Sequence, residues 1–413
     1  MKFTILTYGT DGDTRPLAAL AKELIGQGHE AHLLADVSAA PLAAQHGIPF
    51  TALAGNMQEA LTQGGALAGV MRDGGDVSRI TRACAQIAQR NTTEWMATTR
   101  ELASGSDVLV FSGLASYAGL AVAEGLDMPC VGAGLWPMTP TRDHAAAFMR
   151  PRALPGWANR FTHQFFGALS WAMFRPAVNK GRSYVFGKAP RRAMWQGYPV
   201  LYGCSRVLLP RPNDWPANVD VTGAWHLAPT QAWEPPLALQ AFLDAGEAPI
   251  YVGFGSMTGF DRNKLLAWLV EAVGGRRALF YPGWSGIDVS GLPSNFYVLG
   301  DTPHDWLFPR TSLIVHHGGA GTSHAAARSG VPSVVVPFAG DQFFWADRLA
   351  KAGIATWRPA ARLDGGALGE LMAGAMAPAM RQKARMVADA MRHEDGNRYA
   401  VERMLNGAAQ RLA

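Results

Sequence analysis

Short apolar runs alternate with helical stretches along the first part of this chain. Runs at residues 2–8, 30–36, 107–112 and 129–135 are typical of strands, the first because it is rich in β-branched and aromatic side chains. Helices are predicted from Pro16, which suits a first helical position, to an end at Gly28, and then at 78–102 and 116–125. Strands that alternate with helices predict a parallel sheet.

The alternation is interrupted in the middle of the chain and then starts again. Residues 137–196 are rich in aromatic side chains and predict loops and helices inserted over a pocket, followed by strands at 200–205 and 207–210. Prolines and short turns then indicate a linker at 216–240. The second series has predicted strands at 249–253, 278–283, 296–300, 312–316 and 333–338, and helices at 262–273, at 303–308, from Ala320 and from Gly366 onwards.

We therefore predict an α/β protein with two Rossmann-like parallel-sheet domains that face each other across a cleft. The predicted boundaries are 1–215 for the first domain, 241–390 for the second and 391–413 for a final helix. A length of 413 residues fits two domains, and 48% hydrophobic with 17% charged residues excludes a disordered chain.

The cysteines and the first residues of the chain indicate in which cellular compartment the protein resides. Cys84, Cys130 and Cys204 form neither a disulfide framework nor a zinc-binding pattern, which fits a reducing environment. Lys2 leads directly into a strand, and no apolar run is long enough to cross a bilayer. We expect a cytoplasmic protein.

Positive charge is concentrated between Arg142 and Arg192. This segment has ten Lys or Arg residues and a single acid, Asp143, whereas the whole chain has a net charge of only +5. The simpler interpretation is a solvated helix face. The alternative is weak peripheral contact of segment 142–192 with anionic lipid head groups, because aromatic residues interleave the charges. No nucleic-acid-binding motif accompanies the charge, so we expect no nucleic-acid partner.

A glycine-rich turn at the end of the 312–316 strand predicts a seat for a diphosphate. Gly318, Gly319 and Gly321 let the backbone approach a ligand closely, and Thr322 offers a hydroxyl. The helix that follows has unpaired first-turn N–H groups and a dipole that attract an anion. His317 would add a ring N–H, or a charge if it is protonated.

The next strand ends in a Pro/Gly turn that is followed by Asp341 and Gln342. A carboxylate beside an amide at a strand's carboxyl end suits bidentate recognition of vicinal hydroxyl groups, as in a sugar. A diphosphate seat followed by a polyol-binding pair predicts a nucleotide sugar as ligand.

These segments resemble a known family. HHGGAGT followed by PFAGDQFFWADRL is similar to the nucleotide-sugar signature of family-1 glycosyltransferases. The longer LGDTPHDWLFPRTSLIVHHGGAGT is especially similar to sterol 3β-glucosyltransferases and to bacterial macrolide, glycopeptide and rhamnolipid relatives. The resemblance implies the GT-B arrangement, with an acceptor-binding first domain, a nucleotide-sugar-binding second domain and a final helix that returns to the first. It also implies inverting, metal-independent transfer of a hexose to a lipophilic hydroxyl.

Asp13 is the candidate catalytic residue. Inverting transfer needs a base that takes the proton from the acceptor hydroxyl. GTDGDTRP is similar to the GSxGDxxP turn of sterol and glycopeptide glycosyltransferases, which implies this role for Asp13. The alternative is a helix N-cap that accepts N–H bonds from residues 14–17. Asp11 departs from the family pattern, and it either raises the pKa of Asp13 or points to solvent.

The local chemistry and the resemblance together predict the residues that hold the donor. Each has a structural alternative: a strand-end turn for Gly255 and Ser256, a core side chain for Trp284, and a cap or surface position for His304. Asp341 and Gln342, as DQ rather than EQ, favour UDP-glucose without excluding TDP-sugars. The predicted nucleotide-sugar-binding residues are Gly255, Ser256, Trp284, His304, His317, Gly319, Ala320, Gly321, Thr322, Asp341 and Gln342.

The sequence gives weaker support to other functions. His316 and His317 lack a third ligand at metal-binding spacing, so we expect no metal and no cofactor besides the donor. Asp36 mimics the ribose-binding acid of an NAD site, but two of the three fingerprint glycines are missing. A nucleotide-sugar epimerase and a non-catalytic nucleotide- or lipid-binding protein remain alternatives. The sequence does not choose among sterol, flavonoid and polyketide acceptors.

Overall fold

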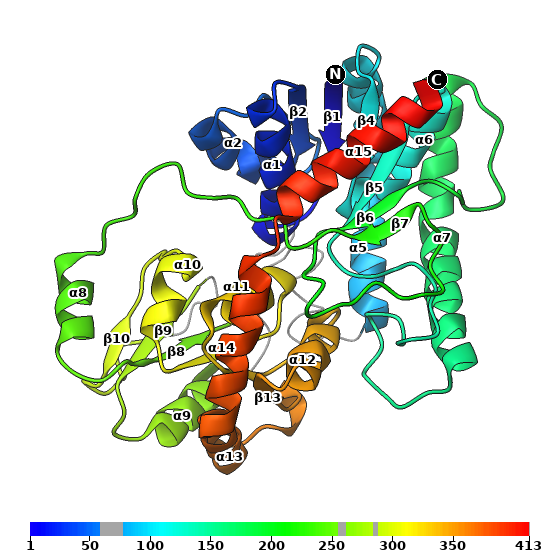
Figure 1. Ribbon diagram of the computed structural model, residues 1–413. Coiled ribbons are helices and arrows are strands. Elements are labelled where there is room, and N and C mark those ends of the chain that lie inside the picture. The colour runs from blue at the N-terminus through cyan, green and yellow to red at the C-terminus, as the bar shows by residue number, and fades with distance from the viewer. Residues whose placement is uncertain (58–76, 255–261, 284–287, 413) are drawn as a thin grey trace.

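The computed structural model describes residues 1–57, 77–254, 262–283 and 288–412, and it has two parallel β-sheets, each covered by helices on both faces (Figure 1). This is the GT-B arrangement of two Rossmann-like domains predicted from the sequence. Among the described residues, no helix is long and apolar enough to span a membrane.

The N-terminal sheet has seven strands in the order β3-β2-β1-β4-β5-β6-β7, and all of its pairs are parallel. Its strands are β1 (Lys2–Leu6), β2 (Glu30–Ala35), β3 (Phe50–Ala52), β4 (Val108–Phe111), β5 (Cys130–Gly134), β6 (Val200–Tyr202) and β7 (Val219–Val221). The accompanying helices are α1 (Asp11–Gly26), α2 (Ala40–His46), α5 (Val77–Ala103), α6 (Ser116–Leu126) and α7 (Gly156–Phe186).

The C-terminal sheet has six parallel strands in the order β10-β9-β8-β11-β12-β13. Its strands are β8 (Ile250–Gly253), β9 (Ala278–Tyr281), β10 (Phe296–Val298), β11 (Leu313–His316), β12 (Ser333–Val335) and β13 (Ala355–Trp357). The helices are α8 (Leu237–Asp244), α9 (Arg262–Val273), α10 (His304–Leu307), α11 (Ala320–Ser329), α12 (Gln342–Lys351), α13 (Gly365–Ala375), α14 (Pro378–Arg392) and α15 (Gly396–Leu412).

Alternating strand residues build a core on each face of both sheets. In β1, Phe3 and Ile5 pack against α1 and α15, whereas Leu6 packs into the core under α5 and α6. In β11, Val315 faces α9 and α13, whereas Ile314 faces α8, α10 and α11. Because successive strand side chains point to opposite faces, strands covered on both sides are apolar throughout.

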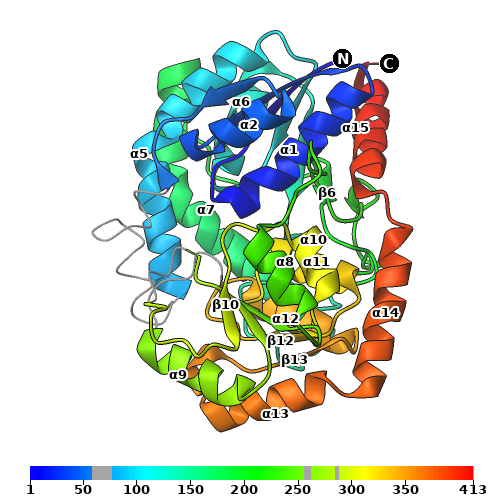
Figure 2. The same cartoon turned by 90° about the vertical axis from the view of Figure 1, so that its left-hand side faces the viewer.

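The end of the chain returns to the N-terminal domain. Helix α14 lies along the C-terminal domain, and α15 lies beside α1, where Val401 and Met404 join the core of the N-terminal sheet (Figure 2). Glu394, between the two helices, accepts hydrogen bonds from the backbone N–H groups of Arg206 (2.7 Å) and Val207 (3.3 Å).

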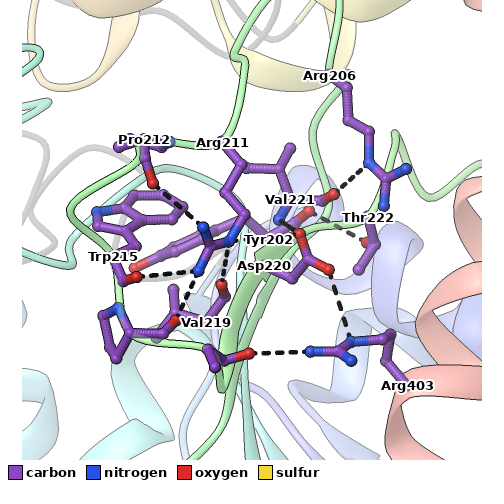
Figure 3. A network of polar contacts seen from close by, with 12 residues as sticks. Tyr202, Arg206, Arg211, Pro212, Trp215, Val219, Asp220, Val221, Thr222 and Arg403 are labelled. Atoms are coloured by element: carbon purple, nitrogen blue, oxygen red, sulfur yellow. Dashed lines mark hydrogen bonds and ion pairs between the residues drawn. The ribbon is translucent and has the colours of Figure 1, made fainter.

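A polar network fastens α15 to the edge strand β7 (Figure 3). Asp220 accepts a hydrogen bond from the Tyr399 hydroxyl at 2.9 Å, and its carboxylate lies 3.6 Å from Arg403. Arg211 donates to the carbonyls of Val219 (2.9 Å) and Pro216 (2.8 Å), which holds the turn before β7 in shape. Strand β7 and helix α8 both lie at least partly within residues 216–240, the segment predicted as linker.

Two local predictions were wrong, and a third, loops and helices at 137–196, was right except that the structure has one long helix. Helix α1 begins at Asp11, so Pro16 lies inside it and only the helical bond to the Gly12 carbonyl is lost. Residues 207–210 form no strand, because Leu208 and Leu209 are buried in clusters that include residues of the C-terminal domain. The 137–196 segment contains one helix of 31 residues, α7, after an irregular loop.

Candidate functional site

The first turn of α1 holds the Asp13 carboxylate. Thr10 is the N-cap residue, and Asp13 is at the third helical position, where its Oδ2 accepts hydrogen bonds from the Thr10 N–H (2.8 Å) and hydroxyl (3.2 Å). Asp13 is therefore not the N-cap residue of α1. It is the acidic residue of a capping box whose N-cap is Thr10. A Cβ at Gly9 would lie 2.3 Å from Asp13 Oδ2, so glycine is required for this close approach.

The pKa of Asp13 is raised above its ordinary value. Burial of the carboxyl is the main cause, the two bonds from Thr10 oppose it, and the negative charge of Asp11 adds a smaller increase. Asp11 is exposed and pairs with Arg15 through Nε (3.0 Å) and Nη2 (3.2 Å). Asp11 thus does both things that the sequence left open: it faces solvent and it raises the pKa of Asp13.

The glycine-rich turn joins β11 to α11 in the C-terminal domain. Gly318 has φ +92°, and a Cβ there would lie 2.9 Å from the Gln342 carbonyl oxygen, so the turn needs glycine. His316 is fully buried, and its Nδ1 accepts a hydrogen bond from the Gly318 N–H at 3.1 Å. Gly319 is the N-cap residue of α11, so the free N–H groups of the first helical turn follow directly.

His317 lies against this turn, since a Cβ at Gly319 would come within 2.6 Å of its Nε2. Burial, and the neighbouring His304, lower the pKa of His317 to about 4. The ring is therefore neutral at pH 7, and it can offer one N–H but no positive charge. Of the two forms considered for His317, burial selects the neutral one.

His304 begins α10 and stacks on Phe308, with a ring-centroid distance of 4.3 Å and an interplanar angle of 14°. Its ring also makes an edge contact with Tyr251 at 6.0 Å. Burial lowers the pKa of His304 to about 4. When protonated, His304 lowers the pKa of His317 by charge repulsion, so the two rings lie in the same part of the C-terminal domain.

Asp341 and Gln342 lie at the start of α12, beyond the carboxyl end of β12. The indole N–H of Trp345 donates to Asp341 Oδ2 at 3.1 Å. Gln342 Oε1 accepts hydrogen bonds from the N–H groups of Phe338 (2.8 Å) and Ala339 (3.2 Å), which fixes the turn before the helix. The contact of Trp345 with Asp341 was not predicted from the sequence, although the two residues are one helical turn apart and their i, i+4 spacing could have indicated it.

Asp341 links the two domains electrostatically. Burial raises the pKa of Asp341 to about 7, and the negative charge of Asp13 is the second cause of this increase. The carboxyl groups at the ends of β1 and β12 therefore lie near each other, although one belongs to each domain. The candidate base and the candidate sugar-binding residue are brought to one site.

His324 connects the anion-binding helix to the N-terminal domain. Its Nδ1 bonds to the Ala320 carbonyl at 2.7 Å, and its Nε2 accepts a hydrogen bond from the Ser205 N–H at 3.1 Å. The ring also packs edge-on against Trp345, 4.7 Å away. His324 therefore has the structural role that its place in α11 suggested, because it joins α11 to the N-terminal domain. Its partner Ser205 is too distant in sequence to be predicted.

Some candidate residues lie elsewhere. Asp36 is buried and accepts bonds from Ser38 N–H (3.0 Å), Ser38 hydroxyl (2.6 Å) and Met57 N–H (2.7 Å), so it caps local structure. Gly255, Ser256 and Trp284 lie outside the described residues. Within the described part of the chain, no three His, Cys, Asp or Glu side chains are grouped in a way that suits a metal ion.

Two family models match the chain. Residues 3–142 match the glycosyltransferase family 28 N-terminal domain, and residues 278–403 match the erythromycin biosynthesis protein CIII-like C-terminal domain. The first match contains Asp13, and the second contains the β11–α11 turn and Asp341.

Curated relatives are similar over almost the whole chain. A sterol 3-beta-glucosyltransferase from Leptosphaeria maculans is 31% identical over 96% of this chain and 28% of its own length. One from Kluyveromyces lactis is 32% identical over 97% of this chain and 34% of its own length. The chain thus spans about a third of the length of these relatives.

Solved structures share the fold. A glycosyltransferase of kitacinnamycin superposes with a TM-score of 0.72 at 18% identity, covering 98% of this chain and 99% of that one. The glycosyltransferase VinC, solved in complex with DTDP, superposes with a TM-score of 0.69 at 20% identity, covering 99% of this chain and 100% of that one.

Proposed function

The chain belongs to the family-1 glycosyltransferases of the GT-B fold, and on this premise we propose that it transfers a hexose to a hydroxyl group of a lipophilic small molecule. The observation that carries the proposal is the electrostatic coupling of Asp13 to Asp341 from the other domain. A base and a sugar-binding carboxylate at one site are what inverting transfer requires.

The donor we propose is UDP-glucose. The relatives from Leptosphaeria maculans and Kluyveromyces lactis are named sterol 3-beta-glucosyltransferases, and the Asp341–Gln342 pair fits a glucosyl group. Gln342 Oε1 accepts hydrogen bonds from two N–H groups of the turn before α12, which holds this side chain in place beside Asp341. A TDP-sugar is the competing donor.

In the proposed reaction, the acceptor oxygen attacks the anomeric carbon while Asp13 takes the hydroxyl proton. The bond from the anomeric carbon to the diphosphate oxygen breaks, and the configuration inverts. The raised pKa of Asp13 makes it a stronger base than an ordinary carboxylate. The bond from the Thr10 N–H holds the carboxylate in place.

The departing diphosphate would be stabilised by the start of α11. Its first-turn N–H groups and dipole favour negative charge, and the neutral His317 ring contributes an N–H. We propose that these groups act without a metal ion.

The acceptor would bind between the loop after β5 and α7. Trp136 and Phe148 make a ring contact at 5.8 Å there, and Phe148 contacts Phe166 of α7 at 6.4 Å. An aromatic lining suits a lipophilic acceptor. The buried thiol of Cys204 forms no disulfide, which fits a reducing compartment, and we place the reaction in the cytoplasm.

Mass spectrometry of the protein with UDP-glucose and a panel of sterol, flavonoid and polyketide hydroxyl compounds tests the proposal. A hexose mass increment on an acceptor is expected with wild-type protein, and its absence is expected with Asp13→Asn. Conversion of the donor without an acceptor would identify an epimerase instead. Donor binding without any turnover, with TDP-glucose tested in parallel, would identify a binding protein.

A further inference from the structure

We propose that the first half of α7 docks this protein on an anionic phospholipid bilayer. Trp157, Phe161, Phe165 and Leu169 have exposed fractions of 73%, 59%, 52% and 41%. Their spacing of four residues places them along one side of the helix over more than three turns. Helix α7 forms the right-hand edge of the molecule in Figure 1, so this stripe lies at the periphery.

The orientation of the helix is determined by its inward polar side. Asn159 donates to the Arg142 carbonyl at 2.9 Å, Thr162 Oγ1 accepts from the Ala146 N–H at 2.8 Å, and His163 Nε2 bonds to the His144 carbonyl at 3.0 Å. Asn159, Thr162 and His163 are all buried. Rotation that buried the aromatic stripe would break these bonds, so the apolar side faces outward as a feature of the fold.

The charge around the stripe favours an anionic surface. No Asp or Glu occurs between residues 144 and 213. Glu124 pairs with Arg182 and Arg191, whereas Arg175 and Lys180 are exposed and pair with no carboxylate among the described residues. Arg160, also exposed, forms a long ion pair with Asp214 at 3.9 Å, and an exposed pair of this kind is weak enough to leave the guanidinium accessible to a head group.

A bilayer fits this combination better than a second copy of the chain. Two such stripes face to face would bring together two copies of a segment that is rich in Arg and lacks Asp and Glu, which like-charge repulsion opposes. Tryptophan, phenylalanine and arginine on one side of a helix instead match the interface of a membrane with acidic head groups. Insertion would be shallow, because only one side of α7 is apolar and exposed.

A series of ring contacts connects the stripe to the interior. Phe161 and Phe165 are 6.4 Å apart, Phe165 and Phe166 are 5.7 Å apart, and Phe166 leads through Phe148 to Trp136. Trp136 follows β5, at the same sheet edge as the turn that carries Asp13. If the proposed function holds, docking would bring the acceptor region close to a membrane in which a lipophilic acceptor dissolves.

The test is flotation of the full chain with vesicles of phosphatidylcholine alone or mixed with phosphatidylglycerol. We expect binding to the anionic vesicles that weakens as salt is raised, because the charged part of the attraction is screened. Replacing Trp157, Phe161 and Phe165 by serine should weaken binding by about tenfold or more, given the apolar area removed. The Arg160→Glu/Arg175→Glu variant should lose the preference for anionic vesicles.

Matched controls replace other exposed apolar residues. Tyr184→Ser, at the far end of α7 and 80% exposed, and Leu237→Ser, on α8 and 89% exposed, should bind like wild type. All variants should keep the thermal unfolding midpoint and the rate of transfer to an acceptor in solution, so failed docking is distinguishable from failed catalysis.

Three results would overturn the proposal. The first is wild-type protein that does not bind anionic vesicles, and the second is a triple variant that binds them as well as wild type. The third is a concentration-dependent dimer in sedimentation velocity that the triple variant lacks, which would assign the stripe to a second copy.

Discussion

The negative charge of Asp13, in the N-terminal domain, helps raise the pKa of Asp341, in the C-terminal domain, to about 7. When two carboxyl groups interact in this way, the one with the higher pKa takes up a proton first. Asp341 is then partly protonated at neutral pH, and the negative charge that raises its pKa is the one that Asp13 needs as a general base.

Donor binding should depend on pH around this value. An ionised Asp341 accepts stronger hydrogen bonds from sugar hydroxyls than a protonated one, so affinity for UDP-glucose should rise as pH increases through about 7. In Asp13→Asn, the neighbouring charge is gone and the midpoint should move to lower pH. Calorimetric titrations over a pH series measure both midpoints, and identical curves would refute the coupling.

The acidic limb of the rate profile should report Asp13. Because burial raises its pKa, kcat at saturating donor should fall with decreasing pH at a higher value than for an ordinary aspartate, and saturation removes the separate pH dependence of donor affinity through Asp341. Asp11→Asn removes the smaller contribution and should move this limb slightly to lower pH, with the plateau rate unchanged. A shift to higher pH would contradict the assignment of Asp13 as the titrating group.

His317→Ala should slow transfer by about a hundredfold or more, the usual cost of losing one donor to a developing anion. The effect should be on kcat more than on KM, because charge accumulates on the diphosphate as the bond breaks. His393→Ala, exposed at the end of α14, is the matched control and should be neutral. Steady-state kinetics of wild-type protein and both variants measure this effect. If His317 contributed only to ground-state binding, His317→Ala would raise KM and leave kcat unchanged.

The fold should lose stability in acid because of its buried histidines. His304, His317 and His324 have pKa values lowered to about 4 by burial, against 6.5 for the ordinary side chain. The unfolded chain therefore binds more protons, and stability present above pH 6.5 is lost as pH falls towards 4. His324→Gln, which can keep one hydrogen bond but cannot be protonated, should flatten this dependence in thermal unfolding. An unchanged pH slope would exclude His324 as a contributor.

Much of the fold and of the candidate site could be predicted because strand and turn residues have local signatures. The strands before Asp13 and His317 and the helix from Ala320 lie where the sequence placed them. The start of α1 at Pro16 was predicted wrongly, because the Thr10–Asp13 capping box starts the helix earlier. Helix α7 was not expected as one element, since in its first half the buried side is polar and the exposed side is aromatic, which hides the usual amphipathic pattern.

Contacts between domains could not be predicted from local sequence. The approach of Asp13 to Asp341 and the bond from Ser205 to His324 depend on how the two sheets are oriented. Leu208 and Leu209 are apolar because they pack at the domain boundary, although as a short apolar run they resemble a strand. Spacing along the chain carries no information about such orientation.

The most direct test of the central claim compares Asp13→Asn with wild type for both catalysis and donor binding. The asparagine oxygen can still accept the Thr10 N–H, so α1 should keep its start. At a pH about one unit above the pKa of Asp341, where that carboxyl is ionised in both proteins, transfer should fall by about 10²- to 10⁴-fold. UDP-glucose affinity, measured by calorimetry, should stay within about threefold, less than one good hydrogen bond. Transfer near the wild-type rate, or loss of donor binding in a folded variant, would contradict the role of Asp13 as the base.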